Sequence, residues 1–346
     1  MNNTKLFSNQ KKIFLLIKSI IKKYPYFVVI ILHEYLRNIE PYDPHIKFKF
    51  ANPKKRIIEL QNKIIKFINL LKYFGNYELK FDRSKKSFLY ETAKAFADRN
   101  ENVYLRDNYN IKKEIKKIKN SLKLRFKSLK FPLKKIKGLK ILDAGCGPGR
   151  FTYVLSSFFP KKIYGVDLSY QNIKIAKKKF KRKNIKYLQG NVLNLPFKNE
   201  NFDFVYSSGV IHHTNNFKKG LRELIRVCKK DGHIYLYIYA KGGIYWQARA
   251  FMNKIMKNIP QYYAQKVLDI IGMPRTRLLF LDLWYVPKEK HTSFKEIKNL
   301  LNKEGITKIT RVKSGAIYDH SSAVKKYKKV GKAIWGEGDI RLLIQK

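Results

Sequence analysis

Three glycines at alternate positions, Gly145, Gly147 and Gly149, follow a short apolar run that contains Ile141 and Leu142. A helical pattern starts directly after them, so this stretch is predicted to be a buried strand, a tight turn and the start of a helix. Glycine lets the backbone bend sharply and lie against a ligand, because no Cβ stands in the way. The helix would direct free N–H groups and its positive dipole end at that ligand. The turn is therefore predicted to hold a nucleotide-like cofactor.

The glycine spacing distinguishes this turn from two other phosphate-binding loops. The dinucleotide fingerprint G-x-G-x-x-G would need a glycine where the chain has Arg150. No Gly-Lys-Ser/Thr follows, which excludes a P-loop. A second predicted strand, 162–166, ends in Asp167, about twenty residues beyond the glycines, where a first βαβ unit places a carboxylate on a ribose hydroxyl pair.

The elements that would position these residues alternate between strands and helices, as in an open α/β sheet. Strands are recognised by short apolar runs between turn residues, and helices by apolar residues three and four positions apart. The predicted strands are 141–142, 162–166, 185–192, 202–209, 233–240, 306–312 and 338–344; the predicted helices are 11–23, 56–74, 111–131, 217–228 and a C-terminal helix that Thr292 and Ser293 cap and that runs to residue 301.

Five segments resemble successive motifs of class I S-adenosylmethionine-dependent methyltransferases, in particular the subgroup that methylates small molecules, quinones and lipid precursors. The resemblance implies a Rossmann-like α/β fold with helices on both faces of a mostly parallel seven-stranded sheet, whose last strand runs antiparallel beside the fifth. The segments are Asp143-Ala-Gly-Cys-Gly-Pro-Gly149, Gly165-Val-Asp-Leu-Ser169, Gly190-Asn-Val-Leu-Asn-Leu-Pro-Phe197, Phe202-Asp-Phe-Val-Tyr-Ser-Ser-Gly-Val-Ile-His-His213 and Arg226-Val-Cys-Lys-Lys-Asp-Gly232.

The resemblance also implies contacts with S-adenosylmethionine. One position departs from the family pattern, because Asn191 stands where Asp is usual, and Asn offers donors and no charge. Adenine would then be held more weakly or differently. The implied contacts are Asp143, Gly145, Gly147 and Gly149 for the methionine part, Asp167 for the ribose hydroxyls, Leu168 and Val192 for the adenine, and Cys146, Asn191 and Ser208 beside them.

The implied chemistry is methyl transfer by in-line displacement at a sulfonium, for which the protein mainly supplies alignment and desolvation. A hydroxyl or acidic carbon as acceptor would need a base. His212 and His213 follow the fourth strand beside the expected methyl position, and an unperturbed histidine titrates near neutrality. Either is a candidate base; alternatively they cap the next helix or pack under a lid. His291, His320 and Tyr318 are lesser candidates.

The chain is predicted to divide into a basic helical N-terminal region, 1–85, and a methyltransferase domain, 86–346. Within the domain, residues 241–291 carry many aromatic side chains and no strand pattern. Such an insertion would lie over the carboxyl ends of the strands as a lid and suit an apolar or aromatic acceptor, unless its aromatics form a small core of their own. Residues 40–53 resemble a linker, and 86–110 would fold over the cofactor.

The formal charge of +50, from 75 basic and 25 acidic residues, has two interpretations. It could serve a nucleic acid or an anionic membrane, or it could reflect a general bias toward residues with AT-rich codons, which its even spread along the chain favours. Two cysteines exclude a disulfide scaffold or a cysteine-rich zinc site and fit a reducing cytosol. No metal is predicted.

The helix at 11–23 has an apolar stripe and flanking lysines. It could pack on its own domain or lie in an anionic membrane interface. Neither it nor the apolar run after it is long enough to span a bilayer, and no signal-peptide cleavage site follows. We therefore predict a cytoplasmic protein, with peripheral membrane contact as the alternative to full solubility.

Three function classes follow from these observations. The first, which we favour, is a methyltransferase that acts on a carbon or oxygen of a small molecule or lipid precursor. The second is an RNA methyltransferase, supported only by the charge. The third is a non-catalytic relative that binds S-adenosylmethionine. The absence of an Asn-Pro-Pro-Tyr motif after the fourth strand argues against methylation of amino groups on DNA bases.

Overall fold

The computed structural model describes most of the chain from residue 110 onward and part of the preceding region. The predicted linker at 40–53, most of 86–110, Tyr318 and much of the predicted lid lie outside the described residues. The described residues are 3–21, 110–256, 289–312 and 320–346, together with 24, 28, 30, 58, 59, 61–66, 68, 69, 94, 97, 100, 259, 261, 263, 264, 285 and 286.

The chain forms two compact units. One comprises Met1–Lys85 and Lys254–Trp284, and the other comprises Lys86–Asn253 and Tyr285–Lys346. All of the predicted cofactor and base residues belong to the second unit. The predicted roles of the chain's parts, a basic N-terminal region and a catalytic domain with a lid, stay a prediction.

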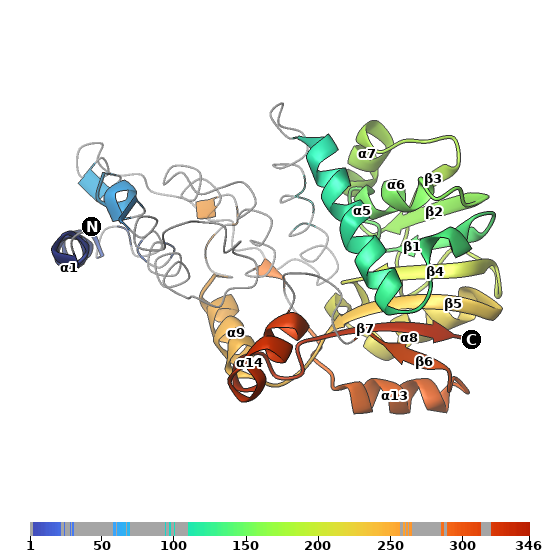
Figure 1. Cartoon of the computed structure of the whole chain (residues 1–346). Helices are drawn as coiled ribbons and strands as arrows, with labels where there is room; N and C mark the ends of the chain where they lie inside the picture. Colours follow the sequence, from blue (N-terminus) through green and yellow to red (C-terminus); the bar gives the residue numbers. More distant parts are fainter. Residues whose placement is uncertain are drawn as a thin grey trace. The chain divides into compact units, whose positions relative to one another are not determined.

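The second unit is built on a seven-stranded sheet, which confirms the predicted fold class (Figure 1). The strand order is β3-β2-β1-β4-β5-β7-β6. Strands β1 to β5 pair in parallel, and β7 runs antiparallel to both of its neighbours, β5 and β6. The strands are β1 (Lys140–Ala144), β2 (Lys162–Asp167), β3 (Ile185–Gln189), β4 (Phe202–Ser208), β5 (Cys228–Tyr239), β6 (Ile309–Arg311) and β7 (Asp339–Gln345).

Helices connect these strands and close both faces of the sheet. On one face, α5 presents Ile118, Leu122 and Phe126, four residues apart, to the sheet together with α6. On the other face, the apolar sides of α8 and α13 pack against the strands. The described helices of this unit are α5 (Ile111–Ser128), the 3-10 helix η1 (Leu133–Ile136), α6 (Arg150–Ser156), α7 (Tyr170–Lys179), the 3-10 helix η2 (Ile211–His213), α8 (Phe217–Val227), α13 (Phe294–Lys303) and α14 (His320–Trp335). The helix α9 (Ile244–Met256) belongs to this unit up to Asn253.

Some boundaries differ from the predicted ones. β3 ends at Gln189 instead of residue 192, because the Asn191 side chain accepts a hydrogen bond from the Leu193 N–H at 2.9 Å and turns the backbone away from the sheet. β5 begins at Cys228 instead of residue 233. The predicted turn at Asp231, where φ is +61°, lies inside the strand as an irregularity of its pairing with β4. The predicted cap of α13 is present, since Ser293 and Glu296 form a capping box.

The first unit contains α1 (Asn3–Ile20), which starts and ends earlier than the predicted helix at 11–23. Its Ile13, Ile17 and Ile20 are buried. A hydrogen bond of 3.1 Å joins Asn9 to Asn62, which lies in the helical residues of the predicted 56–74 segment. The apolar stripe of α1 is therefore covered by protein, and membrane contact stays a prediction. None of the helices in the described part of the chain is long and apolar enough to cross a bilayer.

Candidate functional site

The glycine turn follows β1 directly, as predicted. Its first two amides, on Gly145 and Cys146, donate to the Val166 carbonyl at 2.8 and 2.9 Å, which ties the turn to β2. Gly145 and Gly147 both have positive φ, +85° and +54°. A Cβ on Gly145 would collide with the Val210 side chain, whereas a Cβ on Gly147 would meet no atom within 4 Å. Gly145 is thus required for packing, and Gly147 borders open space in which a ligand can approach the backbone.

Asp167 at the end of β2 lies against the same turn. One of its oxygens accepts the Gly147 N–H at 2.8 Å, and the other accepts the Ser169 N–H and the Asn172 side-chain amide, both at 3.0 Å. The structure therefore brings together the predicted ribose carboxylate and the predicted methionine-binding turn. The contacts of this carboxylate and this turn with S-adenosylmethionine, which the resemblance implies, stay predictions.

Asp143 lies beneath the turn and is almost completely buried, with 2% of its surface exposed. Its Oδ2 accepts a hydrogen bond of 2.6 Å from the Thr152 hydroxyl. Burial, reinforced by the negative charge of Asp167, raises the pKa of this carboxyl to about 7. A positive group of a ligand near this position would favour the ionised form.

Two buried side chains shape the inner wall of the turn. Burial raises the pKa of the Cys146 thiol well above its ordinary value, so Cys146 is a packing residue and not a nucleophile. The Tyr187 ring, on β3, fills the space beside Gly149 and Gly165, and its hydroxyl donates to the Phe180 carbonyl at 2.8 Å. Tyr187 was missed by sequence reasoning, because its contacts come from the neighbouring strand and not from a motif.

The remaining predicted cofactor residues lie at the same edge of the sheet. Leu168 follows β2 and is partly exposed. Asn191 and Val192 follow β3; the Asn191 oxygen is occupied by the Leu193 N–H, and Val192 is 7% exposed within the core. Ser208 is the last residue of β4. Their contacts with a cofactor stay predictions.

The two predicted base candidates lie side by side on η2, directly after β4. His212 is completely buried, and its ring centroid is 4.1 Å from the ring centroids of both His213 and Tyr239. Neither ring nitrogen of His212 has a hydrogen-bond partner among the described residues. Burial lowers its pKa well below the ordinary value, and the neighbouring His213, His291 and Arg249 lower it further. Both effects favour the neutral form of His212.

His213 has different surroundings. Its Nδ1 lies 3.8 Å from the carboxylate of Glu289, which also forms an ion pair with Arg249 and lies 3.4 Å from His291 Nε2. We call His212, His213, Arg249, Glu289 and His291 the histidine cluster. Sequence reasoning missed Arg249 and Glu289, because the segment 241–291 contains many charged residues and nothing in its sequence singles out these two.

The aromatic side chains of the cluster's surroundings come from β5 and α9. The Tyr239 ring centroid lies 5.0 Å from that of the buried Trp246 and 6.1 Å from that of His291. Tyr237 lies beside Gly209, the residue after β4, whose N–H donates to the Tyr237 carbonyl at 3.0 Å. These contacts place an aromatic wall next to the strand end at which the predicted methyl position lies.

His320 and His233 lie in other environments. His320 is buried and its Nδ1 is 3.2 Å from Asp339, which also accepts a bond of 3.2 Å from the Tyr237 hydroxyl. His233 lies in the middle of β5, against Phe131, with ring centroids 4.9 Å apart. The lesser candidate His291 is thus part of the histidine cluster, whereas His320 belongs to a separate pair with Asp339.

Comparisons with known proteins identify relatives of this chain. The family model described as "Methyltransferase domain" matches residues 142–236. The demethylmenaquinone methyltransferase of Lactococcus lactis is 31% identical over 191 residues, which are 53% of this chain and 72% of that protein. The phthiotriol/phenolphthiotriol dimycocerosates methyltransferase of Mycobacterium leprae is 32% identical over 29% of this chain and only 37% of its own length.

Among solved structures, the magnesium protoporphyrin IX methyltransferase of Synechocystis, determined with bound SAH, is similar to this chain. It is 14% identical, the matched region covers 75% of this chain and 100% of that chain, and the TM-score is 0.46.

Proposed function

Because the chain belongs to the class I S-adenosylmethionine-dependent methyltransferases, we propose that it methylates a small apolar or aromatic acceptor at the carboxyl edge of its sheet. The observation that supports this acceptor class is the aromatic wall of Tyr237, Tyr239 and Trp246 beside the end of β4. Flat apolar surfaces with a few polar groups are what an aromatic acceptor requires.

The residues of the glycine turn fit the cofactor. Gly147 borders open space, and Asp167 presents a partly exposed carboxylate beside it. Asp143, Gly147 and Asp167 would bind the methionine part and the ribose, and the resemblance adds Leu168 and Val192 for the adenine. S-adenosylmethionine supplies, when bound, a methyl group that is already activated on a sulfonium.

The Lactococcus relative, named for demethylmenaquinone, supplies a first acceptor to test. A ring carbon is nucleophilic in the hydroquinone and not in the quinone, so the assay would offer demethylmenaquinone in its reduced form with methyl-labelled S-adenosylmethionine. We expect label in the hydroquinone. Glu304→Gln, which removes only a surface pair with Arg222, should behave like the unchanged protein. Cofactor binding without transfer to any acceptor would favour the non-catalytic alternative.

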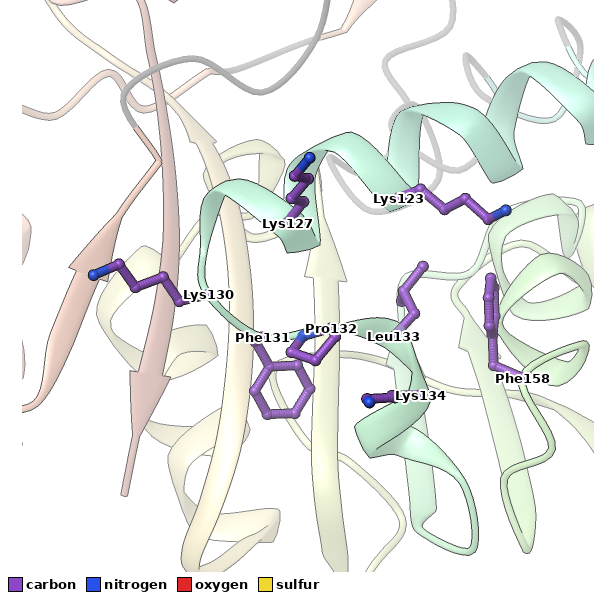
Figure 2. A pocket seen from close by; sticks show the side chains of 8 residues that line it. All are labelled: Lys123, Lys127, Lys130, Phe131, Pro132, Leu133, Lys134 and Phe158. Atoms are coloured by element: carbon purple, nitrogen blue, oxygen red, sulfur yellow. The ribbon is translucent and has the colours of Figure 1, made fainter.

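RNA methylation is a second candidate, favoured by a lysine-lined pocket away from the glycine turn. Figure 2 shows that four lysine side chains and four apolar side chains line this pocket. The pocket has a volume of about 520 Å³. Its lining residues are Lys123, Lys127, Lys130, Phe131, Pro132, Leu133, Lys134 and Phe158.

A salt titration of RNA binding tests this candidate. Replacing the four lysines of the pocket by glutamine should reduce the log–log salt slope by roughly one for each phosphate group that the variant no longer neutralises. Glutamine at Lys177, Lys178 and Lys179, at the end of α7, provides a control of similar charge change. If the pocket variant and the α7 variant have equal salt slopes, RNA binding comes from the overall charge of +50. The pocket would then give no support for an RNA substrate.

Peripheral contact with an anionic membrane is proposed for α1, which leaves Phe14 and Leu15 61% and 57% exposed near Lys11, Lys12 and Lys18. In vesicle flotation, the full chain should float with anionic vesicles more than Phe14→Ser/Leu15→Ser does. Equal flotation of the two proteins would attribute membrane binding to net charge.

A further inference from the structure

We propose that Glu289, held by Arg249, positions His213 as the base that takes the acceptor's proton, and that His212 does not act as a base. The proposal rests on the proposed function, because it assigns roles within the same acceptor site. The sequence alone makes His212 and His213 equal candidates for the base, and the proposal distinguishes between them.

The carboxylate of Glu289 is the centre of the histidine cluster. Glu289 and Arg249 form an ion pair in which each side chain is 7% exposed. One Glu289 oxygen lies 3.8 Å from His213 Nδ1, and the other lies 3.4 Å from His291 Nε2. The opposite ring nitrogen of His291 is 3.2 Å from the Ala240 carbonyl. The carboxylate is thus surrounded by three groups that can donate a proton or carry positive charge.

These neighbours keep Glu289 ionised. Burial alone would raise its pKa, but Arg249, His291 and His213 hold the pKa of this carboxyl below its ordinary value. An ionised carboxylate beside Nδ1 favours the tautomer of His213 that carries its proton on Nδ1. In that tautomer Nε2 is the unprotonated ring nitrogen, and the carboxylate stabilises the imidazolium that forms when Nε2 accepts a proton.

The distance of 3.8 Å between His213 and Glu289 is that of an ion pair. Hydrogen bonds of catalytic groups are often long before the substrate binds, and they shorten in the reacting complex. The two segments are fixed to each other independently of this contact, because the Lys290 N–H donates to the His212 carbonyl at 2.7 Å. The fold therefore positions Glu289 beside His213 through the backbone.

His212 has no carboxylate within ion-pair distance among the described residues. It is completely buried, its ring nitrogens have no hydrogen-bond partner in the described part of the chain, and its ring packs at an angle against that of Tyr239. The charged and titratable groups that act on it are His213, His291, Arg249 and, with the opposite sign, Asp339. A proton on His212 would be unsolvated and next to positive charge, so His212 stays neutral.

The proposed step transfers one proton. As the acceptor oxygen or carbon donates an electron pair to the methyl carbon, its O–H or C–H bond breaks and the proton goes to His213 Nε2. The electron pair of the broken sulfur–carbon bond remains on sulfur, which becomes a neutral thioether. The positive charge thereby passes from the sulfonium to the imidazolium of His213, beside Glu289, and the proton then leaves to solvent.

A histidine titration by NMR tests the dyad without any acceptor. Chemical shifts of labelled histidines would be followed against pH in the unchanged protein, in Glu289→Gln and in the control Glu304→Gln. We expect the midpoint of His213 to move to lower pH in Glu289→Gln only, because the variant removes the negative charge that stabilises the imidazolium. An unchanged His213 midpoint would overturn the proposal.

A second variant covers the case in which Glu289→Gln leaves Arg249 buried without a partner and the protein fails to fold. Arg249→Met/Glu289→Leu removes both charges at once, a change that buried ion pairs often tolerate. It should shift the His213 midpoint in the same direction but by less than Glu289→Gln does, because it also removes the positive charge of Arg249, while Glu289→Asp should restore part of the original midpoint. A His213 midpoint that is the same in the unchanged protein and in every folded variant without the Glu289 carboxylate would overturn the proposal.

Methyl transfer to the hydroquinone of demethylmenaquinone tests the base itself. We expect His213→Asn to reduce kcat about a hundredfold or more, Glu289→Gln to reduce it less and to move the acid limb of its pH profile to lower pH, and His212→Asn to leave that limb in place. Equal losses in the two histidine variants, or no loss in His213→Asn, would overturn the base assignment. No transfer by the unchanged protein would overturn the proposed acceptor alone, since the NMR titration still decides the dyad.

Discussion

Asp143 in the glycine turn and Glu289 in the histidine cluster are both buried carboxyl groups, but their pKa values shift in opposite directions. Asp143 has the Thr152 hydroxyl as its hydrogen-bond donor and a second carboxylate, Asp167, nearby, and its pKa rises to about 7. Glu289 has the Arg249 guanidinium beside it, and its pKa falls. Burial raises the pKa of both carboxyls, so the difference between the two pKa values comes from the charge of their neighbours.

In the glycine turn, we expect the largest effect, a loss of folding stability, from Gly145→Ala. The left-handed conformation costs about 1–2 kcal/mol for a residue with a Cβ, and the collision with Val210 adds about 1–3 kcal/mol. Gly147→Ala has the same kind of strain and no collision, so it should lose less stability while its methyl group obstructs the cofactor.

Urea unfolding and calorimetry with SAH separate the two variants. Gly145→Ala should have the lower free energy of unfolding, and Gly147→Ala should have a weakened affinity in a folded protein. Similar stabilities together with an unchanged affinity in Gly147→Ala would contradict the assignment of the open space to the cofactor.

Asp143→Asn tests the proton on the buried acid. In the folded chain Asp143 keeps its proton up to about pH 7, whereas its ordinary pKa is 3.8. Between these values the folded state binds more protons than the unfolded state, so this group's contribution to stability falls as pH rises from about 4 to 7 and is constant above that range. The full difference corresponds to about 4 kcal/mol.

The difference in unfolding free energy between Asp143→Asn and the unchanged protein should therefore shift in favour of the variant from pH 4.5 to pH 8. The shift should be at most about 4 kcal/mol. Urea unfolding at the two pH values measures the shift. A difference in stability that does not change with pH would mean that Asp143 is already ionised in the folded protein.

Asp167→Ala tests the cofactor contact itself. A carboxylate that accepts ribose hydroxyls contributes about 1.5–3 kcal/mol, so affinity should fall roughly ten- to a hundredfold. Asp203→Ala is the matched control, because Asp203 also accepts protein donors, from Lys140 and Lys229, but lies near the start of β4. If calorimetry gives equal dissociation constants for Asp167→Ala and the control, the ribose assignment is wrong.

The smallest effect is expected from His212→Phe. Because His212 has no hydrogen-bond partner among the described residues and lies on an aromatic ring, the substitution should change stability by less than about 1.5 kcal/mol at pH 7.5. The folded pKa of His212 is lowered, so below about pH 6.5 the unfolded chain takes up a proton that the folded chain does not.

The unchanged protein should lose this part of its stability as pH falls through that range, and His212→Phe should not. Unfolding of the unchanged protein and of the variant at pH 5.5 and 7.5 measures the difference. A variant that loses as much stability as the unchanged protein between these two pH values would show that His212 does not stay neutral in the folded state.

The two regions also differ in how much of them the sequence predicts. The glycine turn was predicted residue by residue, because Gly145, Gly147 and Asp167 belong to one βαβ unit and short-range spacing encodes their arrangement. The histidine cluster joins residues after β4, on α9 and in the segment before α13. Spacing therefore identified the two histidines, whereas the pairing of His213 with Glu289 depends on the tertiary fold.

For the fold, the presence of the strands was predicted from the sequence, whereas some of their ends were not. The positions of the strands along the chain followed from apolar runs and turn residues, and their parallel and antiparallel arrangement followed from the family resemblance. The end of β3 did not, because a side chain, that of Asn191, bonds to the backbone and stops the strand. The start of β5 was missed because the irregular pairing around Asp231 depends on the neighbouring strand.

The Tyr187 ring has a consequence for how this family of sequences can diverge. A Cβ on Gly149 would lie 2.6 Å from the Tyr187 hydroxyl, and one on Gly165 would lie 2.7 Å from its ring. Three positions from separate parts of the sequence thus share one volume, and a larger residue at either glycine requires a smaller one at 187. Homologous chains should therefore covary at these positions, and an alanine at 165 should be tolerated far better alongside Tyr187→Leu than alone.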